Sequence, residues 1–493
     1  MPERGIVLAL DEGTTGATAV AVGLEGEVRG KGYREITQHF PRPGWVEHDA
    51  DEIWSAVQAT AAEALDQAKA GPDEVLAIGI TNQRETLVLW DRRTLRPISR
   101  AIVWQDRRTT AECLRLREDG REGHVSEVTG LVIDPYFTAT KAGWAMQHID
   151  GARDAALGTI DSWLVARLSG GRDHVTDASN ASRTMLFDIR RGAWSAEMTE
   201  LFGVPLENLP EVRDSSGSIS RSDPATFLGV AAPISGIAGD QQAALFGQAC
   251  LDVGMAKNTY GTGSFVLLHT GPERVRSRSG MLTTIAWRRE GRLSYALEGA
   301  IFITGAALQW LRDGLGIIKS AAEAGPLAGS VPDTGGVYLV PAFVGLGAPH
   351  WDPNARGTIV GLTRGTGRAH VVRAAVEAMA YQTRDVVEAM QEDSGSTFQE
   401  LRVDGGAVVM DVMCQFQADL LGIPVRRPRL TETTALGAAY LAGLGAGVWQ
   451  DGDLKGLWKL DREFTPQISR DQADTMQHKW RQAVERSRGW DNQ

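Results

Sequence analysis

The feature that most restricts the fold of this 493-residue chain is a short motif that occurs twice. Residues 6–22 contain two apolar runs around a polar turn that carries glycines and threonines, and residues 256–267 repeat this arrangement. Apolar runs around such a turn predict a β-hairpin. Because the two hairpins open halves of roughly equal length, they predict a duplicated α/β domain with a ligand bound between the halves.

The tips of both hairpins are suited to binding phosphate. Glycines let a ligand approach the backbone closely, threonine hydroxyls donate hydrogen bonds, and an acid at the strand end can bind the accompanying Mg²⁺. An ordinary hairpin turn is an equally good interpretation of the first tip alone. The residues concerned are Asp11, Gly13, Thr14, Thr15 and Gly16 in the first hairpin and Gly261, Thr262 and Gly263 in the second.

Residues 234–247 place an acid where an apolar run is expected to turn into a helix. Gly236 and Gly239 are expected to supply turn conformations that residues with a Cβ avoid. Asp240 then stands at the predicted helix start, where the helix dipole keeps a carboxylate ionised. This residue is either a helix N-cap or a general base that faces a cleft between two halves. On this stretch alone the N-cap is the better interpretation.

Three predicted strand ends in the N-terminal half carry polar or aromatic side chains, and open α/β sheets bind their ligands at such ends. Arg84 and Glu85 follow the apolar run of residues 75–80. They could bind adjacent hydroxyl groups of a polyol, or they could form a salt bridge that closes a loop. Trp104 and Tyr136 lie at the other two strand ends, where aromatic rings can line a pocket.

Composition narrows the class of protein. Hydrophobic residues make up 43% and charged residues 23% of the chain, which is typical of a soluble globular protein, and the length predicts two or three domains. The formal net charge of −11 argues against binding to nucleic acid or to an anionic membrane. No apolar run reaches transmembrane length and no signal peptide is seen, so we expect a cytoplasmic protein without integral membrane association.

Missing motifs narrow the class further. The three cysteines are widely spaced, so they predict neither a disulfide nor a metal framework and fit a reducing compartment. The absence of GxxxxGK[ST], complete GxGxxG, HExxH and GxSxG argues against P-loop NTPases, dinucleotide-dependent oxidoreductases, zinc proteases and serine hydrolases. Phosphate loops without a P-loop lysine instead favour an α/β fold of two actin-like (RNase H-like) domains with a cleft between them.

Longer motifs make the chain resemble the FGGY carbohydrate kinases, and within them the members that phosphorylate glycerol. The resemblance runs through nearly the whole chain. It implies an N-terminal FGGY domain over residues 1–247, with the polyol pocket and the first phosphate loop, and a C-terminal FGGY domain over residues 248–493 on the nucleotide side. The motifs that carry it are Pro43–Asp49, Gly79–Thr86, Thr129–Tyr136, Asn180–Phe187, Gly236–Gly247 and Ala256–Gly263.

The resemblance implies in-line, Mg²⁺-assisted transfer of a phosphoryl group from ATP to glycerol, which gives sn-glycerol 3-phosphate. Asp240 is then the general base for the attacking hydroxyl, and Asp11 and Asp240 are the implied Mg²⁺ ligands. The implied glycerol-binding residues are Arg84, Glu85, Trp104, Tyr136, Asp240, Gln241 and Phe265. The implied nucleotide-binding residues are Thr14, Thr15, Gly16, Thr262, Gly305, Gln309, Gly406 and Met410. Glycerol and ATP are the expected partners, and the expected assembly is a homo-oligomer, a dimer or tetramer.

Several positions depart from the usual pattern of the family. Glu12 replaces a glutamine, Thr18 replaces a phosphate-side arginine, and Met410 stands where an asparagine near the adenine is common. The lost arginine predicts weaker nucleotide binding or a substitute cation. Residues 223–233 lack the glycine-rich basic loop that binds fructose 1,6-bisphosphate in some relatives, and they lack the histidine phosphorylated in others. Neither form of regulation is therefore expected.

Two other functions stay open on the sequence alone. The first is a kinase of another small polyol or ketose, which ranks lower because Trp104, Tyr136 and Phe265 suit a three-carbon substrate. The second is a polyol-binding protein with an impaired nucleotide site, which rests on Thr18 and Met410.

Overall fold

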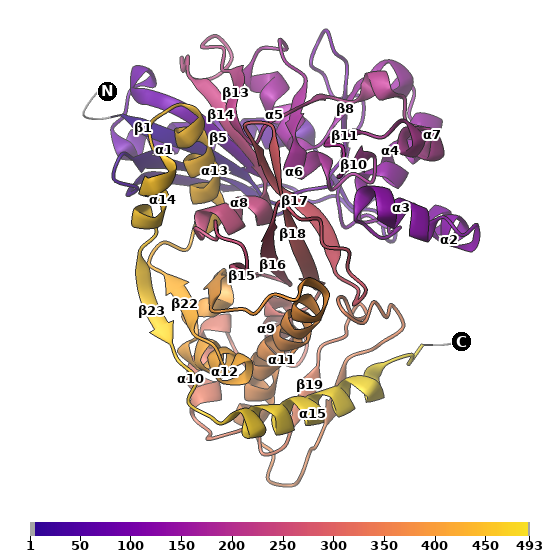
Figure 1. Cartoon of the computed structure of the whole chain (residues 1–493), viewed down its shortest axis with the longest axis vertical. Coiled ribbons are helices and arrows are strands. Elements are labelled where there is room, and N and C mark those ends of the chain that lie inside the picture. Colours follow the sequence, from indigo (N-terminus) through magenta and orange to yellow (C-terminus); the bar gives the residue numbers. More distant parts are fainter. Residues whose placement is uncertain (1–4, 492–493) are drawn as a thin grey trace.

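The computed structural model describes residues 5–491 and has two α/β halves that share one 13-stranded sheet (Figure 1). The strand order in this sheet is β23-β22-β21-β15-β16-β18-β17-β13-β14-β5-β1-β2-β3. In Figure 1 the N-terminal half lies at the top and the C-terminal half at the bottom, with β16, β17 and β18 between them.

The large sheet takes strands from both halves. Those of the N-terminal half are β1 (Ile6–Glu12), β2 (Gly16–Gly23), β3 (Val28–Glu35), β5 (Val75–Asn82), β13 (Ser216–Arg221) and β14 (Pro233–Gly239). Those of the C-terminal half are β15 (Ala256–Tyr260), β16 (Ser264–Gly271), β17 (Leu282–Arg289), β18 (Arg292–Ile301), β21 (Leu401–Asp404), β22 (Val425–Pro428) and β23 (Leu460–Phe464). Two-stranded sheets pair β4 (Glu47–His48) with β7 (Ala101–Ile102), β6 (Val88–Trp90) with β8 (Ala156–Gly158), β9 (Val175–Asp177) with β12 (Glu211–Arg213), β10 (Phe187–Asp188) with β11 (Ala193–Trp194), and β19 (Tyr338–Val340) with β20 (Thr358–Val360).

Helices cover the large sheet and fill the long connections between its strands. Up to residue 247 they are α1 (Ala50–Ala68), α2 (Thr110–Glu118), α3 (Glu122–Thr129), α4 (Thr138–His148), α5 (Ile160–Leu168), α6 (Ala178–Ala181), α7 (Ala196–Phe202) and α8 (Asp240–Gly247). The later ones are α9 (Gly305–Asp313), α10 (Ala324–Gly329), α11 (Arg368–Ser394), α12 (Asp411–Leu421), α13 (Thr433–Gly445), α14 (Asp451–Leu457) and α15 (Arg470–Ser487). Within residues 5–491, none of the helices is both long and apolar enough to span a membrane.

The two halves repeat one topology. In the N-terminal half β1 pairs antiparallel with β2 and β2 with β3, whereas β5 pairs parallel with β1 and β14 with β5. In the C-terminal half β15, β16, β18, β21 and β22 pair in the same sequence of directions. The duplicated α/β domain predicted from the two hairpins is therefore confirmed.

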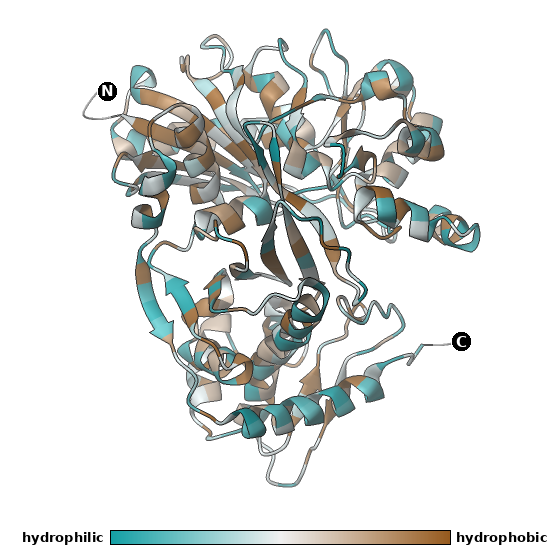
Figure 2. Ribbon diagram, in the orientation of Figure 1, coloured by the Kyte–Doolittle hydropathy of each residue, from teal (hydrophilic) through white to brown (hydrophobic). Residues whose placement is uncertain are grey.

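Strand β1 shows why helices are needed on both faces of the sheet. Ile6, Leu8 and Leu10 belong to the hydrophobic core that includes α1, whereas Val7 and Ala9 pack in a core with α13. All five side chains are at most 1% exposed. A strand that is buried on both faces has a continuous apolar sequence, as residues 6–10 do. Figure 2 shows hydrophobic residues in brown along the central strands, while the outer helix α15 is largely hydrophilic.

Helix α13 comes late in the chain but packs on the sheet of the N-terminal half. A Cβ at Gly79 of β5 would lie 2.2 Å from the carbonyl oxygen of Ala438, and one at Gly236 of β14 would lie 2.3 Å from the nitrogen of Ala442. The chain therefore crosses back to the first half after residue 432. A domain boundary at residue 247 stays a prediction, and α13 is an element that the two halves exchange across it.

The turn conformations predicted for Gly236 and Gly239 are wrong. Neither residue has a positive φ, and both lie in the extended strand β14. Each glycine is instead a point of close approach, by α13 at Gly236 and by the side chain of Arg84 at Gly239, where a Cβ would lie 2.6 Å from Cδ of the arginine. Packing against neighbours, not backbone conformation, requires glycine here.

Candidate active site

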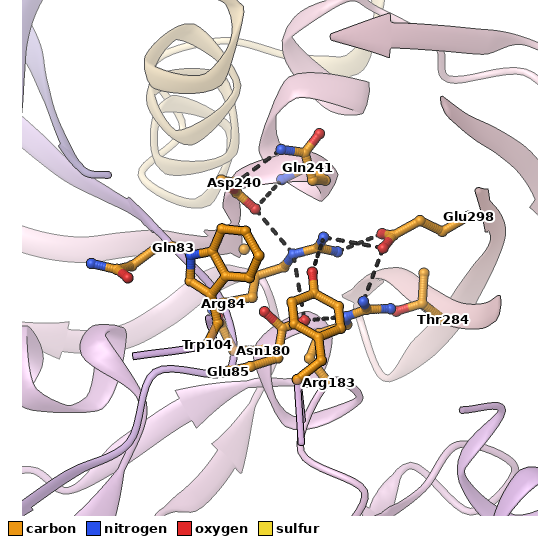
Figure 3. Close-up of polar contacts among 12 residues, drawn as sticks. Gln83, Arg84, Glu85, Trp104, Asn180, Arg183, Asp240, Gln241, Thr284 and Glu298 are labelled. Atoms are coloured by element: carbon orange, nitrogen blue, oxygen red, sulfur yellow. Dashed lines mark hydrogen bonds and ion pairs between the residues drawn. The ribbon is translucent and has the colours of Figure 1, made fainter. Parts of the chain in front are cut away.

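The two polar pairs predicted to bind a polyol lie at neighbouring strand ends (Figure 3). Arg84 and Glu85 follow β5, and Asp240 and Gln241 begin α8 directly after β14, which pairs parallel with β5. Parallel strands bring their carboxyl ends to one edge of a sheet, so the two pairs meet there. The Nε atom of Arg84 lies 3.0 Å from Oδ1 of Asp240.

Three aromatic side chains lie beside these polar pairs. The rings of Trp104 and Tyr136 meet edge to face at 5.4 Å, and the guanidinium carbon of Arg84 lies 5.7 Å from the ring centre of Phe265. Phe265 belongs to β16 of the C-terminal half, so the candidate pocket takes residues from both halves. The structure thus brings the predicted glycerol-binding residues together, and their contacts with glycerol stay a prediction.

Asp240 is the first residue of α8 and not its N-cap. Gly239 occupies the N-cap position, and no side chain caps this helix end. The Asp240 carboxylate instead accepts hydrogen bonds from the backbone N–H of Gln241 at 2.7 Å and from Nε2 of Gln241 at 3.1 Å. Its side chain is 31% exposed, so it is held by donors and still open to a substrate. The N-cap interpretation is wrong, whereas the role of general base stays a prediction.

A buried ionic network surrounds Arg84, and two of its members were not singled out from the sequence. Glu298 of β18 accepts hydrogen bonds from Nη1 of Arg84 at 2.5 Å and from Nη2 of Arg183 at 2.9 Å, and Nε of Arg183 donates to Glu85 at 2.7 Å. All four side chains are at most 2% exposed. Burial acts to raise the pKa of Glu298, but the two guanidinium groups outweigh it and lower this pKa. The sequence feature that could have indicated this network is Glu298 itself, an acid within the apolar run of β18.

In this structure the guanidinium group of Arg84 is already engaged by several partners of the network. Besides Asp240 and Glu298, its guanidinium donates to Oε1 of Gln242 at 3.2 Å and to the hydroxyl of Tyr136 at 3.5 Å. The salt bridge considered between Arg84 and Glu85 is long, at 3.9 Å. Glu85 itself has a φ of 63°, a conformation that is unfavourable for a residue with a side chain and that is enriched at functional sites. Burial raises the pKa of Glu85, and the two arginines offset part of this rise.

The first predicted phosphate loop stands next to the polyol pocket. A backbone hydrogen bond from Gly13 to Gly16 closes the hairpin at 3.0 Å, and the indole Nε1 of Trp104 donates to the hydroxyl of Thr14 at 2.8 Å. Thr15 is exposed at the tip, whereas Gly16 is buried. The loop therefore presents its threonines beside the aromatic wall.

The second predicted phosphate loop packs against the start of α9. The backbone N–H of Gly305 donates to the carbonyl of Gly261 at 3.0 Å, and a Cβ at Gly305 would lie 2.5 Å from that oxygen. The carbonyl of Thr262 accepts in turn from the backbone of Ala306. Gln309 is exposed on α9, and Gly406 is exposed just after β21, the parallel neighbour of β15. Nucleotide contacts by these residues stay predictions.

Met410 fits its predicted role least well. Its side chain is 7% exposed and belongs to the hydrophobic core of the C-terminal half, where Cγ would lie 3.2 Å from a Cβ at Gly325. Its neighbour Val409 is 71% exposed. A contact between Met410 and a nucleotide stays a prediction. The burial of this side chain favours a role in packing the hydrophobic core.

Asp11 and Asp240 lie close enough for their charges to interact. Burial and the charge of Asp240 raise the pKa of Asp11 to about 7, and the charge of Lys31 acts against this rise. Among residues 5–491 no group of three or more His, Cys, Asp or Glu side chains is placed to hold a metal ion. Two carboxylates nevertheless fit Mg²⁺, which proteins usually hold with one or two carboxylates plus substrate phosphates and water.

Thr18, the position of the missing arginine, lies on β2 directly opposite Asp11 of β1. The same face of the next strand, β3, carries Lys31, whose ammonium pairs with Oε1 of Glu432 at 2.6 Å. Side chains two residues apart on a strand share a face, so Lys31 is a cation on the side of the sheet that Thr18 and Asp11 occupy.

Glu12 is an acid in a fully buried position. Both of its carboxyl oxygens lie near Nε2 of Gln83, at 3.0 and 3.3 Å, and the same amide nitrogen lies 3.3 Å from Nδ1 of His48. Burial raises the pKa of Glu12 well above its usual range, and the hydrogen bond from Gln83 offsets only part of this rise. Burial thus favours the protonated form of Glu12, which is close in shape to the glutamine that it replaces.

Comparison with known proteins agrees with this geometry. Residues 6–247 match the N-terminal domain and residues 256–446 the C-terminal domain of the FGGY family of carbohydrate kinases. A glycerol kinase of Dechloromonas aromatica is 56% identical over 493 residues, which cover 99% of this chain and 98% of that protein. Another, from Carboxydothermus hydrogenoformans, is 55% identical over 98% of both chains. The crystal structure of Plasmodium falciparum glycerol kinase with ADP superimposes with a TM-score of 0.91 at 33% identity, covering 98% of each chain.

The fold, the site and these similarities define a two-domain sugar or polyol kinase. The chain belongs to the FGGY family of carbohydrate kinases. The predicted family and the predicted actin-like fold of two α/β domains are thereby confirmed.

Proposed function

We propose that this protein catalyses the ATP-dependent phosphorylation of glycerol to sn-glycerol 3-phosphate. Full-length relatives with 55–56% identity are glycerol kinases, and a glycerol kinase that binds ADP has the same fold. The observation that carries the proposal is the position of Asp240, a partly exposed carboxylate anchored by Arg84 beside the Trp104 and Tyr136 rings. Aromatic walls of this kind suit the small three-carbon backbone of glycerol.

The chemistry follows from the surroundings of Asp240. Its carboxylate takes the proton of the attacking terminal hydroxyl, while Arg84 and Gln241 hold the carboxylate in place. Catalysis of phosphoryl transfer is chiefly positioning and charge neutralisation, which the two glycine and threonine loops serve. Asp11 and Asp240 would hold Mg²⁺, and a bound Mg²⁺ neutralises negative charge on the phosphate oxygens.

The two halves of the chain have different roles in the proposed reaction. Residues 1–247 supply most of the polyol pocket and the first phosphate loop, and residues 248–493 supply the nucleotide side. The three cysteines are buried and free, which is consistent with a reducing, cytoplasmic location. Assembly into a dimer or tetramer is part of the proposal and follows from the family resemblance alone.

The test is ADP release measured with glycerol and with a panel of other polyols and ketoses. We expect release that depends on glycerol, and the highest kcat/KM for glycerol in the panel. ADP release that glycerol does not accelerate would contradict the proposal. A higher kcat/KM for a ketose would favour the alternative of a different carbohydrate kinase, because kcat/KM measures discrimination between substrates.

A further inference from the structure

A lysine of the C-terminal half reaches the helix that carries Asp240. Lys257 lies on β15, and its side chain is fully buried. Its ammonium group donates to Oε1 of Gln241, the second residue of α8, and to the hydroxyl of Thr259 at 2.8 Å. One charged group thus joins a strand of one half to the candidate base site of the other.

Lys257 determines which way the amide of Gln241 faces. An amide has an acceptor end and a donor end, and an ammonium group, which can only donate, occupies the acceptor. The donor end, Nε2, then points at Oδ2 of Asp240 at 3.1 Å (Figure 3). In the reversed orientation the amide oxygen would face the carboxylate and repel it. The contact with Lys257 excludes that orientation, because it would also set the amide NH₂ against the ammonium.

Several charged groups act on Lys257. Burial lowers its pKa to about 8, and the carboxylates of Asp404, Asp240 and Glu298 oppose this effect, whereas Arg84 adds to it. The ammonium form therefore predominates at neutral pH and can donate to Gln241. Carboxylates on β21, α8 and β18 together stabilise this buried cation.

The same strand leads to the second phosphate loop. Lys257 and Thr259 lie on one face of β15, which ends at Tyr260 immediately before Gly261. Thr259 also pairs across the strands with Phe265, the aromatic residue that the C-terminal half contributes to the pocket. Lys257 therefore stands between the predicted nucleotide side and the predicted base.

We propose that Lys257 is a positioning residue for phosphoryl transfer, which sets the amide of Gln241 and, through it, the carboxylate of Asp240. The inference rests on the proposed function, because it concerns how the base of that reaction is oriented. It means that Asp240 has its working orientation only while β15 lies against α8. The hydrogen-bonded chain from Lys257 to Gln241 to Asp240 then couples the two halves, in addition to the contact between Glu298 and Arg84.

Replacement of the lysine by methionine tests this directly. Lys257→Met keeps most of the buried volume and removes the donor. We expect kcat to fall by about 100-fold, the loss that a misplaced reacting group can cause. Calorimetry without the second substrate should show glycerol binding weakened by about tenfold, the equivalent of one hydrogen bond, and ADP binding unchanged. Lys455→Met, which removes an exposed lysine far from the site, is the matched control and should change none of these values.

A double-mutant cycle separates positioning from other roles. If Lys257 acts through Gln241, Lys257→Met should add little to the loss already caused by Gln241→Met. Gln241→Glu keeps an acceptor for Lys257 but places a second carboxylate against Asp240, so we expect it to be as inactive as Gln241→Met. Lys257→Arg retains a donor and should recover part of kcat.

The outcomes are distinct. Multiplicative losses in the cycle, or weaker ADP binding in Lys257→Met, would overturn the inference and place the ammonium on the phosphates instead. An unchanged kcat in Lys257→Met would overturn it as well. If Lys257→Met does not fold, the activity of Gln241→Glu decides, and near-normal turnover there would overturn the inference. Failure of the proposed function is recognised separately, because the unmodified protein would then not phosphorylate glycerol at all.

Discussion

The indole Nε1 of Trp104 donates a hydrogen bond to the hydroxyl oxygen of Thr14 at 2.8 Å. Trp104 is predicted to form a wall of the glycerol pocket, and Thr14 belongs to the first predicted phosphate loop. The bond therefore joins the two substrate sites of the proposed reaction within the N-terminal half. We therefore expect a substitution at the pocket wall to change the affinity for the nucleotide.

Trp104→Phe tests this connection. Phenylalanine keeps an aromatic ring beside Tyr136 but has no N–H to hold Thr14. We expect ADP binding, measured by calorimetry, to weaken by about fivefold, which corresponds to roughly 1 kcal/mol for one hydrogen bond. Thr14→Val removes the acceptor of the same bond, so the double variant should be little weaker than either single one. Equal ADP affinity in Trp104→Phe and the unmodified protein would show that the bond does not order the loop.

Asp240→Asn tests the proposed base. Asparagine has nearly the same shape but cannot accept a proton from the attacking hydroxyl at neutral pH. We expect kcat to fall by at least about 10²-fold, in the range found for positioned general bases, while glycerol still binds. Steady-state kinetics and glycerol calorimetry check the two parts. Near-normal turnover would remove Asp240 from this role.

Glu298→Ala tests the buried network. The change removes the carboxylate that both Arg84 and Arg183 contact, and it leaves their two guanidinium groups buried. Removing one partner of a buried ion pair costs about 3–5 kcal/mol, so we expect the free energy of unfolding in urea to drop by this amount. Asp252→Asn, which breaks the exposed pair with Lys455, is the control and should cost no more than about 1 kcal/mol. Similar losses in the two variants would contradict the importance of the network.

Local patterns made most of the fold predictable. The two hairpins follow from pairs of apolar runs that flank glycine- and threonine-bearing turns, and the same topology in both halves follows from the repetition of this motif. The ends of parallel strands share one sheet edge, so Arg84 and Asp240 could be expected near each other from the sequence alone. What could not be predicted depends on contacts between segments far apart in the chain.

The residues missed by sequence reasoning are of that second kind. Glu298 meets Arg84 across 214 residues, and Lys257 meets Gln241 across the two halves. No spacing rule links such positions, because only the folded sheet brings them together. The turn conformations predicted for Gly236 and Gly239 are wrong for the same reason, since the small size of these glycines serves packing against α13 and Arg84, which the local sequence does not reveal.

Nucleotide binding with Mg²⁺ should depend on pH through Asp11. This carboxyl has a pKa raised to about 7, chiefly by burial and then by Asp240. A carboxyl must lose its proton to bind Mg²⁺, so affinity for Mg²⁺-ADP should fall as the pH drops below 7. Because Lys31 lowers this pKa, Lys31→Met should shift the fall to higher pH. Calorimetry between pH 6 and pH 8.5 measures both effects.

The control for this titration is Asp11→Asn, which carries no proton to lose at these pH values. Its affinity for Mg²⁺-ADP should be low and nearly independent of pH apart from the titration of the nucleotide itself. If the unmodified protein and Asp11→Asn have the same pH profile, Asp11 does not bind the ion. If Lys31→Met leaves the profile of the unmodified protein in place, the ammonium of Lys31 does not act on Asp11.

Glu12→Gln should stabilise the fold in a pH-dependent way. The pKa of Glu12 is raised well above its ordinary value of 4.5, so the folded protein holds a proton that the unfolded chain releases above that value. Any stability contributed by the proton is complete below pH 4.5 and is lost progressively as the pH rises toward the folded pKa. Glutamine has the same shape and no proton to lose. We therefore expect the variant to gain stability relative to the unmodified protein as the pH rises from 5 to 8, measured as the free energy of unfolding in urea. A difference between the two proteins that does not change with pH would show that Glu12 is ionised in the fold.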